Sequence, residues 1–242
     1  YNHTFSGGDW CYNKIVPNYF SRFWAENNWS NGSGCGNDLA TERSMARNYI
    51  VDSIMYWVEE YHVDGFRFDL AGLIDTQTIN EITNTVHAKY PDVIFYGEGW
   101  SSGDTAVQDG HSLATKGNAW ITGSMGFYND SFRNDIAGDN GRSWGFATGD
   151  SGKADAIGNY FRASNGWSGS PSQTINYASA HDNYTLIDKI IMTKGGTGWF
   201  DMVKMNNLAA AVYMMAQGTP FIYSGEEILR EKVDGNGNRY DN

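Results

Sequence analysis

The sequence predicts an α/β fold with a parallel β-sheet, in a chain of 242 residues that is long enough for one barrel-sized domain. Two observations predict this fold. Short apolar runs alternate with helical patterns along the chain, and that order builds right-handed βαβ units. Three of the apolar runs end in polar residues that include a carboxylate, and the carboxyl ends of parallel strands are where such folds carry their functional side chains.

The first predicted unit is a helix followed by a strand. A helix is expected over 41–61, because four apolar residues recur on one face at a period of 3.6. The four are Ile50, Ile54, Trp57 and Tyr61. The strand at 62–68 follows this helix, and it ends in the run Gly-Phe-Arg-Phe-Asp at 65–69.

The second predicted unit repeats that order. A helix fits 76–89, with Asp75 or Thr76 as its N-terminal cap. A strand at 93–97 follows it and leads directly into Glu98. The Gly-, Ser- and Asp-rich stretch 99–126 is then expected to be a loop, and a loop of this length in a compact domain is usually functional.

The remaining elements are shorter. Helices are expected at 129–137, 153–163, 184–192 and 201–216, and strands at 174–178 and 220–224. In the last helix, Met205, Leu208, Val212 and Met215 form a stripe that indicates core packing. No internal repeat and no linker interrupts the chain, so residues 1–242 are expected to belong to a single domain.

The composition excludes some function classes. A formal net charge of −11 argues against a nucleic-acid partner, which needs a basic surface. No apolar run approaches the roughly 20 residues of a membrane helix. The 9 Trp and 15 Tyr fill a core, or some of them offer flat faces to sugar rings. Cys11 and Cys35 could pair or stay free, and two cysteines fix no compartment.

Three carboxylates are candidates for chemistry: Asp69, Glu98 and Asp182. Taken singly, an acidic residue is more often solvated or a helix cap. Three of them close behind apolar strands favour a functional edge of the sheet. Cleavage of a glycosidic bond needs one carboxylic acid that protonates the leaving oxygen and one carboxylate on the other face of the sugar. The pattern therefore suggests a carbohydrate-cleaving centre.

Basic side chains stand close to these acids. Arg67 precedes Asp69 by two residues and so shares its face of the strand, where pairing would keep Asp69 ionised whether its role is structural or catalytic. His3 and His181 could ligate a metal or donate hydrogen bonds to hydroxyl groups. Donation is favoured, because no His-x-x-x-His or Cys-x-x-Cys pattern supports a metal site. No metal ligand is predicted.

Four short segments together resemble the α-amylase superfamily, glycoside hydrolase family 13. They are Tyr-Asn-His-Thr at 1–4, Gly-Phe-Arg-Phe-Asp at 65–69, Tyr-Gly-Glu at 96–98 and His-Asp-Asn at 181–183. The resemblance implies a (β/α)8 TIM-type barrel of which this chain holds about strands 3–8. The first strands and accessory β domains are expected to lie outside the chain.

Carried over position by position, the resemblance assigns a role to each candidate. It implies that Asp69 is the nucleophile, Glu98 the acid/base and Asp182 the stabiliser of the transition state. It implies that further side chains bind the substrate. These are His3, Arg67, Trp100 and His181.

Within the superfamily the sequence is most similar to the type I pullulanases, which debranch α-glucans at α-1,6 linkages. The similar stretches are 14–17, 31–34, 115–117, 145–149 and 181–186, several of them outside the four segments above. Trp100 and Ala180 differ from ordinary α-amylases. Gly99 and Ile187 depart from many pullulanases, which have proline and tryptophan there, and the Tyr-Asn-Trp-Gly-Tyr motif is expected upstream of this chain.

The sequence thus predicts a retaining hydrolase of α-1,6 branch linkages that acts on α-glucan polysaccharides or oligosaccharides. An isoamylase-like or α-1,4-cleaving enzyme, and a barrel kept only for carbohydrate binding, are the alternatives. No cofactor is required, although the full-length protein could bind calcium. Secretion is expected, with a cytoplasmic location left open. The excised 242 residues are expected to be inactive, because a barrel closes only when every strand is paired.

Overall fold

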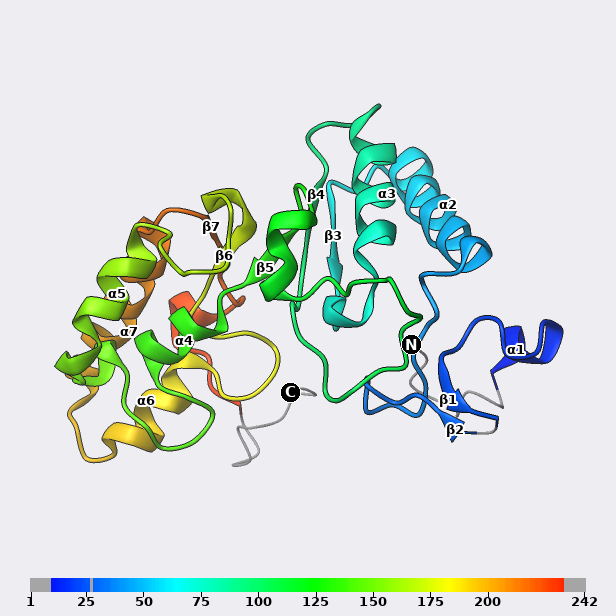
Figure 1. The fold of residues 1–242 in the computed structure, drawn as a ribbon. Helices are drawn as coiled ribbons and strands as arrows, with labels where there is room; N and C mark the ends of the chain where they lie inside the picture. The colour runs from blue at the N-terminus through cyan, green and yellow to red at the C-terminus, as the bar shows by residue number, and fades with distance from the viewer. Residues whose placement is uncertain (1–9, 27, 233–242) are drawn as a thin grey trace. The chain divides into compact units, whose positions relative to one another are not determined.

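The structure, a computed structural model, describes residues 10–26 and 28–232 (Figure 1). The chain divides into two compact units, residues 1–127 and residues 128–242, and each unit is described by itself. His3 lies outside the described residues, as does the whole of the first of the four sequence segments that carry the family resemblance, residues 1–4.

Five short strands follow one another in chain order in one sheet. They are β3 (Gly65–Phe68), β4 (Ile94–Gly97), β5 (Gly126–Tyr128), β6 (Thr174–Asn176) and β7 (Thr219–Pro220). The pairs β3–β4, β4–β5 and β6–β7 are parallel. Sequential parallel strands with helices between them are the building pattern of a (β/α)8 barrel. The predicted fold class, a partial barrel, is confirmed.

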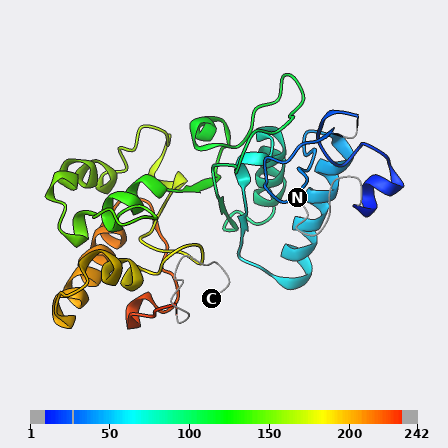
Figure 2. The same cartoon turned by 90° about the horizontal axis from the view of Figure 1, so that it is seen from below.

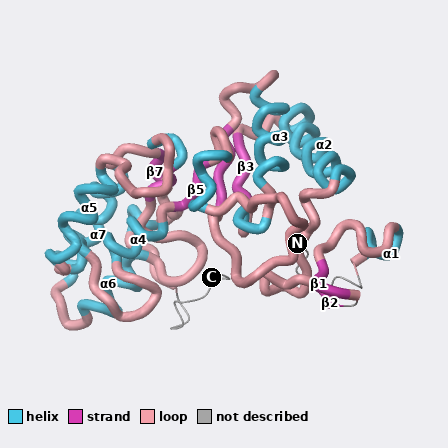
Figure 3. Tube along the Cα trace, viewed as in Figure 1, coloured by secondary structure: helices cyan, strands magenta, loops and turns pink. Residues whose placement is uncertain are grey.

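The first unit surrounds β3 and β4 with two helices and long connections. Its helical and further strand elements are α1 (Cys11–Ile15), β1 (Phe23–Ala25), β2 (Asn28–Trp29), α2 (Ser44–Tyr61), η1 (Ala71–Leu73), α3 (Thr76–His87) and η2 (Lys116–Ile121). β1 and β2 pair antiparallel. The predicted loop 99–126 holds η2 and is otherwise irregular as far as Met125, as the pink trace between β4 and β5 illustrates (Figure 3).

Helix α3 has the predicted cap and face. The Asp75 side chain accepts a hydrogen bond from the backbone N–H of Thr78 at 3.1 Å. Ile79, Ile82 and Val86 are fully buried on one stripe. A carboxylate cap of this kind satisfies backbone donors that the first helical turn leaves without partners. Helices α2 and α3 lie side by side in both views of the molecule (Figures 1 and 2).

The predicted buried face of α2 was partly wrong. Ile54 is buried as expected, but Trp57 and Tyr61 are 45% and 57% exposed. The buried stripe is Ala46, Arg47, Val51, Ile54 and Val58. This stripe has the same helical spacing as the predicted one, so periodicity alone did not distinguish the two faces. Arg47 is buried because its guanidinium donates to Thr78 and Asp75 near the start of α3.

The second unit packs its helices around one apolar core. Its elements besides β6 and β7 are α4 (Asp130–Ala137), η3 (Phe146–Thr148), η4 (Ser151–Lys153), α5 (Ala154–Phe161), η5 (Pro171–Gln173), α6 (Leu186–Lys194), α7 (Trp199–Met215) and η6 (Glu226–Ile228). The largest fully buried side chains of this core are Phe132, Ile136, Leu186, Ile187, Ile190 and Tyr213. Four of these six side chains are leucine or isoleucine.

Two predictions, one for α7 and one for β5, were incomplete. In α7, Met205 and Val212 pack against the core, whereas Leu208 and Met215 are 42% and 72% exposed, because α7 is apolar around most of its circumference. Strand β5 was not predicted. Its three buried residues are too few to show an alternating pattern.

Candidate active site

One guanidinium contacts two of the predicted catalytic carboxylates. Arg67, on β3, donates through Nη1 to Oδ1 of Asp69. Its Nη2 lies 2.9 Å from Oε1 of Glu98, which follows the end of β4. The two acids meet because β3 and β4 are parallel and in register, with Phe68 opposite Gly97. The fixed fork of an arginine can contact two acids at once, which an ammonium group cannot match.

The two carboxylates differ in solvent exposure. The Asp69 side chain is 42% exposed, and that of Glu98 is 8% exposed. Glu98 therefore lies beneath the surface, with Asp69 at the rim of the sheet. One guanidinium shared between both offsets part of the repulsion that two neighbouring carboxylates exert on each other.

The turn after Asp69 holds Glu98 from a second side. The backbone N–H of Leu70 donates to Oε2 of Glu98 at 2.8 Å, and the N–H of Gly72 donates to its carbonyl oxygen at 2.9 Å. Leu70 has a φ of 44°, in the left-handed region that a bulky residue rarely adopts. Such a conformation costs of the order of 1–3 kcal/mol and recurs at functional sites. Here it directs an N–H at Glu98.

Glycines let the strands and the turn approach closely around Glu98. A Cβ on Gly97 would lie 2.4 Å from the carbonyl oxygen of Phe68, and one on Gly72 would lie 2.4 Å from that of Trp100. Trp100 is half-buried, with Nζ of Lys116 5.7 Å from its ring centroid. The backbone of Trp100 is thereby packed against the turn that follows Asp69.

The other predicted pair lies in the second unit, on the turn that follows β6. Nε2 of His181 is 3.6 Å from Oδ1 of Asp182, and the two side chains are 49% and 45% exposed. The next residue, Asn183, has a φ of 65°, which its side chain tolerates better than most. The carbonyl oxygen of His181 accepts a hydrogen bond from Nζ of Lys232 at 2.9 Å.

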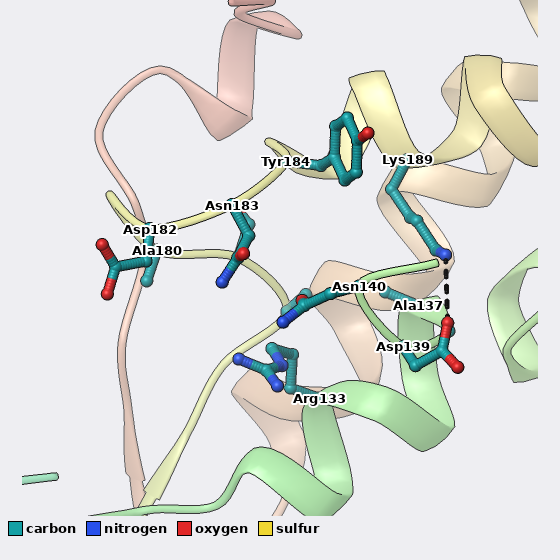
Figure 4. Close-up of a pocket in the computed structure, with 12 residues that line it drawn as sticks. Arg133, Ala137, Asp139, Asn140, Ala180, Asp182, Asn183, Tyr184 and Lys189 are labelled. Carbon is teal, nitrogen blue, oxygen red and sulfur yellow. Dashed lines mark ion pairs between the residues drawn. The ribbon is translucent and has the colours of Figure 1, made fainter. Parts of the chain in front are cut away.

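A small cavity lies beside this turn. Its volume is about 20 Å³, which is room for about one water molecule. Figure 4 shows Arg133, Asn140 and Asn183 gathered on one side of the turn, while the carboxylate of Asp182 points away from them. Lys189 pairs with Asp139 at 3.9 Å at the far wall (Figure 4).

The structure thus brings the candidates together in two groups. Arg67 contacts both Asp69 and Glu98 within the first unit, and His181 contacts Asp182 within the second. Within the part of the chain that the structure describes, no group of three or more His, Cys, Asp or Glu side chains is placed to hold a metal ion. No disulfide bond joins Cys11 to Cys35.

Some residues of the site were not predicted. Leu70 gave no signal, because an apolar residue after a strand does not reveal its backbone angle. Glu226 and Lys232, which hold the His181–Asp182 turn, follow β7. Glu226 carries the same sequence signal as the other acids, since it too stands behind a short apolar run that is expected to be a strand, at 220–224.

A family model described as "Alpha amylase, catalytic domain" matches residues 1–238. The chain belongs to the alpha-amylase family. It is 39% identical over 241 residues to a pullulanase of Bacillus subtilis (strain 168), covering 96% of this chain and 33% of that protein. The chain therefore spans about a third of that relative's length, and 19% of pullulanase A of Streptococcus pneumoniae serotype 2.

Solved structures give the same family and fold. The pullulanase from Bacillus acidopullulyticus superposes with a TM-score of 0.90 at 43% identity, over 100% of this chain and 30% of that one. The pullulanase of Anoxybacillus sp. LM18-11 complexed with maltotetraose gives 0.89 at 37% identity, over 96% of this chain and 34% of that one. The predicted family resemblance is confirmed.

The close approach of β3 and β4 can be tested at Gly97. Gly97→Ala is expected to lower the free energy of unfolding by about 3 kcal/mol or more, because its methyl group would collide with the backbone of Phe68. Gly117→Ala is the matched control, since its nearest neighbour would lie 3.7 Å away. Melting temperatures of the two variants measure the difference. Equal melting temperatures would contradict the packing described here.

Proposed function

We propose that this chain is the catalytic part of a retaining glycoside hydrolase that cleaves α-1,6 branch linkages in pullulan, amylopectin or related α-glucans. The observation that carries the proposal is the contact of Arg67 with both Asp69 and Glu98 at the ends of adjacent parallel strands. The similarity to pullulanases over 96% of the chain supports the bond type.

In the first step, the carboxylate of Asp69 attacks the anomeric carbon of the sugar on the non-reducing side of the bond. Glu98 gives its proton to the glycosidic oxygen, which leaves with the rest of the glucan as a hydroxyl group. A covalent glycosyl ester of Asp69 results. The greater exposure of Asp69 suits the residue that must reach the sugar carbon, and the burial of Glu98 keeps competing water away from its proton.

In the second step, the ionised Glu98 takes a proton from a water molecule. The water oxygen attacks the anomeric carbon and releases the carboxylate of Asp69, so both residues return to their initial states. Two inversions at one carbon retain the α configuration. Arg67 contacts both acids and so is placed to stabilise the carboxylate that each step generates.

The remaining roles rest on the family resemblance. Asp182 is proposed to stabilise the positive charge that develops on the sugar ring, and His3, His181 and Trp100 to bind the sugar with Arg67. His181 and Asp182 are half-exposed, so a substrate can reach both side chains. Maltose, maltotriose and maltotetraose occur in complexes of solved pullulanases, which supports an α-glucan oligosaccharide as ligand here.

Location and calcium stay predictions. No helix in residues 10–26 and 28–232 is long and apolar enough to cross a membrane. Secretion stays the location expected from the sequence, with a cytoplasmic location left open. The sequence predicts no cofactor requirement and leaves calcium binding by the full-length protein open.

The bond type is tested on the full-length product of the reading frame that contains this chain. Reducing ends should appear from pullulan and not from soluble amylose, since only pullulan has α-1,6 bonds. Release from amylose instead would replace the debranching function by an α-1,4-cleaving one. Binding of both polymers without release from either would mean a barrel that only binds carbohydrate.

The role of Asp69 is tested by Asp69→Asn in the same protein. Turnover should fall below about a hundredth of the wild-type value, because an amide cannot form the glycosyl ester. Affinity for maltotetraose should stay nearly unchanged, since binding is spread over many contacts. Asp92→Asn is the control, because Asp92 is exposed near the opposite end of β4. A variant at Asp69 that keeps more than this turnover would exclude it as the nucleophile.

The role of Glu98 is tested by Glu98→Gln with azide as an external nucleophile. On pullulan, activity should fall by about 10²–10⁴-fold, because glutamine neither gives nor takes a proton. With an α-maltosyl fluoride, whose leaving group needs no acid, azide should restore turnover and give the α-maltosyl azide. No effect of azide, or a β-azide product, would show that another residue is the acid/base.

A further inference from the structure

A buried carboxyl group connects three elements of the second unit. Glu226, at the start of η6, is 6% exposed. Its Oε2 accepts a hydrogen bond from Oγ of Ser179 and its Oε1 one from the hydroxyl of Tyr213 on α7, both at 2.6 Å. No basic side chain pairs with it among the residues that the structure describes. Burial raises the pKa of Glu226, although the two hydroxyl donors oppose that shift.

A second buried polar side chain reaches the same turn. Lys232 is 6% exposed, and its Nζ donates to the carbonyl oxygen of His181 at 2.9 Å. Its backbone N–H donates to Oδ2 of Asp188 at 3.1 Å, the carboxylate that also accepts from Thr185 at the N-terminal cap of α6. The segment 226–232 is therefore fixed to both α6 and α7, the two longest helices of its unit.

These two anchors hold the chain immediately before Asp182. Glu226 binds Ser179 and Lys232 binds His181, so the two fixed points flank Ala180. Asp182 itself is 45% exposed and contacts His181 at 3.6 Å. Its carboxylate is therefore placed by its backbone more than by side-chain contacts. A displacement of about 1 Å at a catalytic group can cost about 10² in rate.

We propose that Glu226 and Lys232 are positioning residues, which hold the turn 179–183 so that Asp182 keeps the geometry its reaction needs. This inference rests on the function proposed above and on the role of Asp182 in it. Neither residue touches the reacting sugar in this account. Each acts through one residue of the turn: Glu226 accepts a hydrogen bond from the hydroxyl of Ser179, and Lys232 donates one to the backbone carbonyl of His181.

Two variants that each remove one hydroxyl group distinguish a positioning role of Glu226 from a purely structural role. Ser179→Ala and Tyr213→Phe each remove one hydrogen bond of equal length to the same carboxyl group. Only Ser179 belongs to the turn. Ser179→Ala should lower kcat about tenfold or more with KM nearly unchanged. Tyr213→Phe should lower the melting temperature while kcat stays within about twofold of wild type.

The role of Lys232 is tested by a variant and a matched control. Lys232→Met should lower kcat about tenfold, because the carbonyl of His181 loses its donor. Lys204→Met is the control, since Lys204 is exposed and pairs with Asp201 on the surface of α7. Glu226→Gln should behave like Ser179→Ala, and if that variant does not fold, the milder Ser179 substitution still decides the matter.

All variants are measured in the full-length product, on whichever of pullulan and amylose the wild-type protein cleaves. The positioning role is overturned if Ser179→Ala and Lys232→Met keep kcat within about twofold, or if Tyr213→Phe loses as much kcat as Ser179→Ala. Wild-type cleavage of amylose alone would overturn the proposed bond type and leave the positioning role to be decided on amylose. A protein that cleaves neither polymer would overturn both.

Discussion

The contact of Arg67 with Asp69 and Glu98 is the interaction on which the candidate site depends. Two carboxylates at the ends of neighbouring strands repel each other, and a fixed cation between them makes their proximity tolerable. The guanidinium also sets the orientation of each acid. The same ion pairs hold in place the two side chains to which the proposed function assigns the chemistry.

That contact in turn requires the backbones of β3 and β4 to approach each other closely. Gly97 faces the carbonyl of Phe68 with no room for a side chain, and Leu70 adopts a left-handed angle that aims its N–H at Glu98. Each feature is unfavourable in isolation. Together they place the buried acid against β3, while Asp69 stays at the exposed rim. In the second unit, the chain just before Asp182 is held by two buried side chains. Glu226 binds the hydroxyl of Ser179, and Lys232 binds the carbonyl of His181.

Much of this arrangement could be predicted from sequence. The strands that end at Phe68 and Gly97, the Asp75 cap and the ion pair of Arg67 with Asp69 all follow from local pattern. The buried face of α2 could not be predicted in this way, because two stripes of the helix share the helical period. Only packing against α3 determines which of the two stripes is buried. Strand β5 was missed because three residues carry no periodicity. The angle of Leu70 is set by its contact with Glu98, which lies 28 residues away and has no local signature.

The central claim is that Asp69 is the nucleophile of a retaining mechanism. The most direct measurement is mass spectrometry of peptides from the full-length protein after reaction with a fluorinated maltosyl fluoride whose glycosyl ester hydrolyses slowly. The account predicts one maltosyl ester, on the peptide that contains Asp69, and none after the substitution Asp69→Asn. An ester on Glu98 or Asp182, or steady turnover of the reagent with no ester, would contradict it.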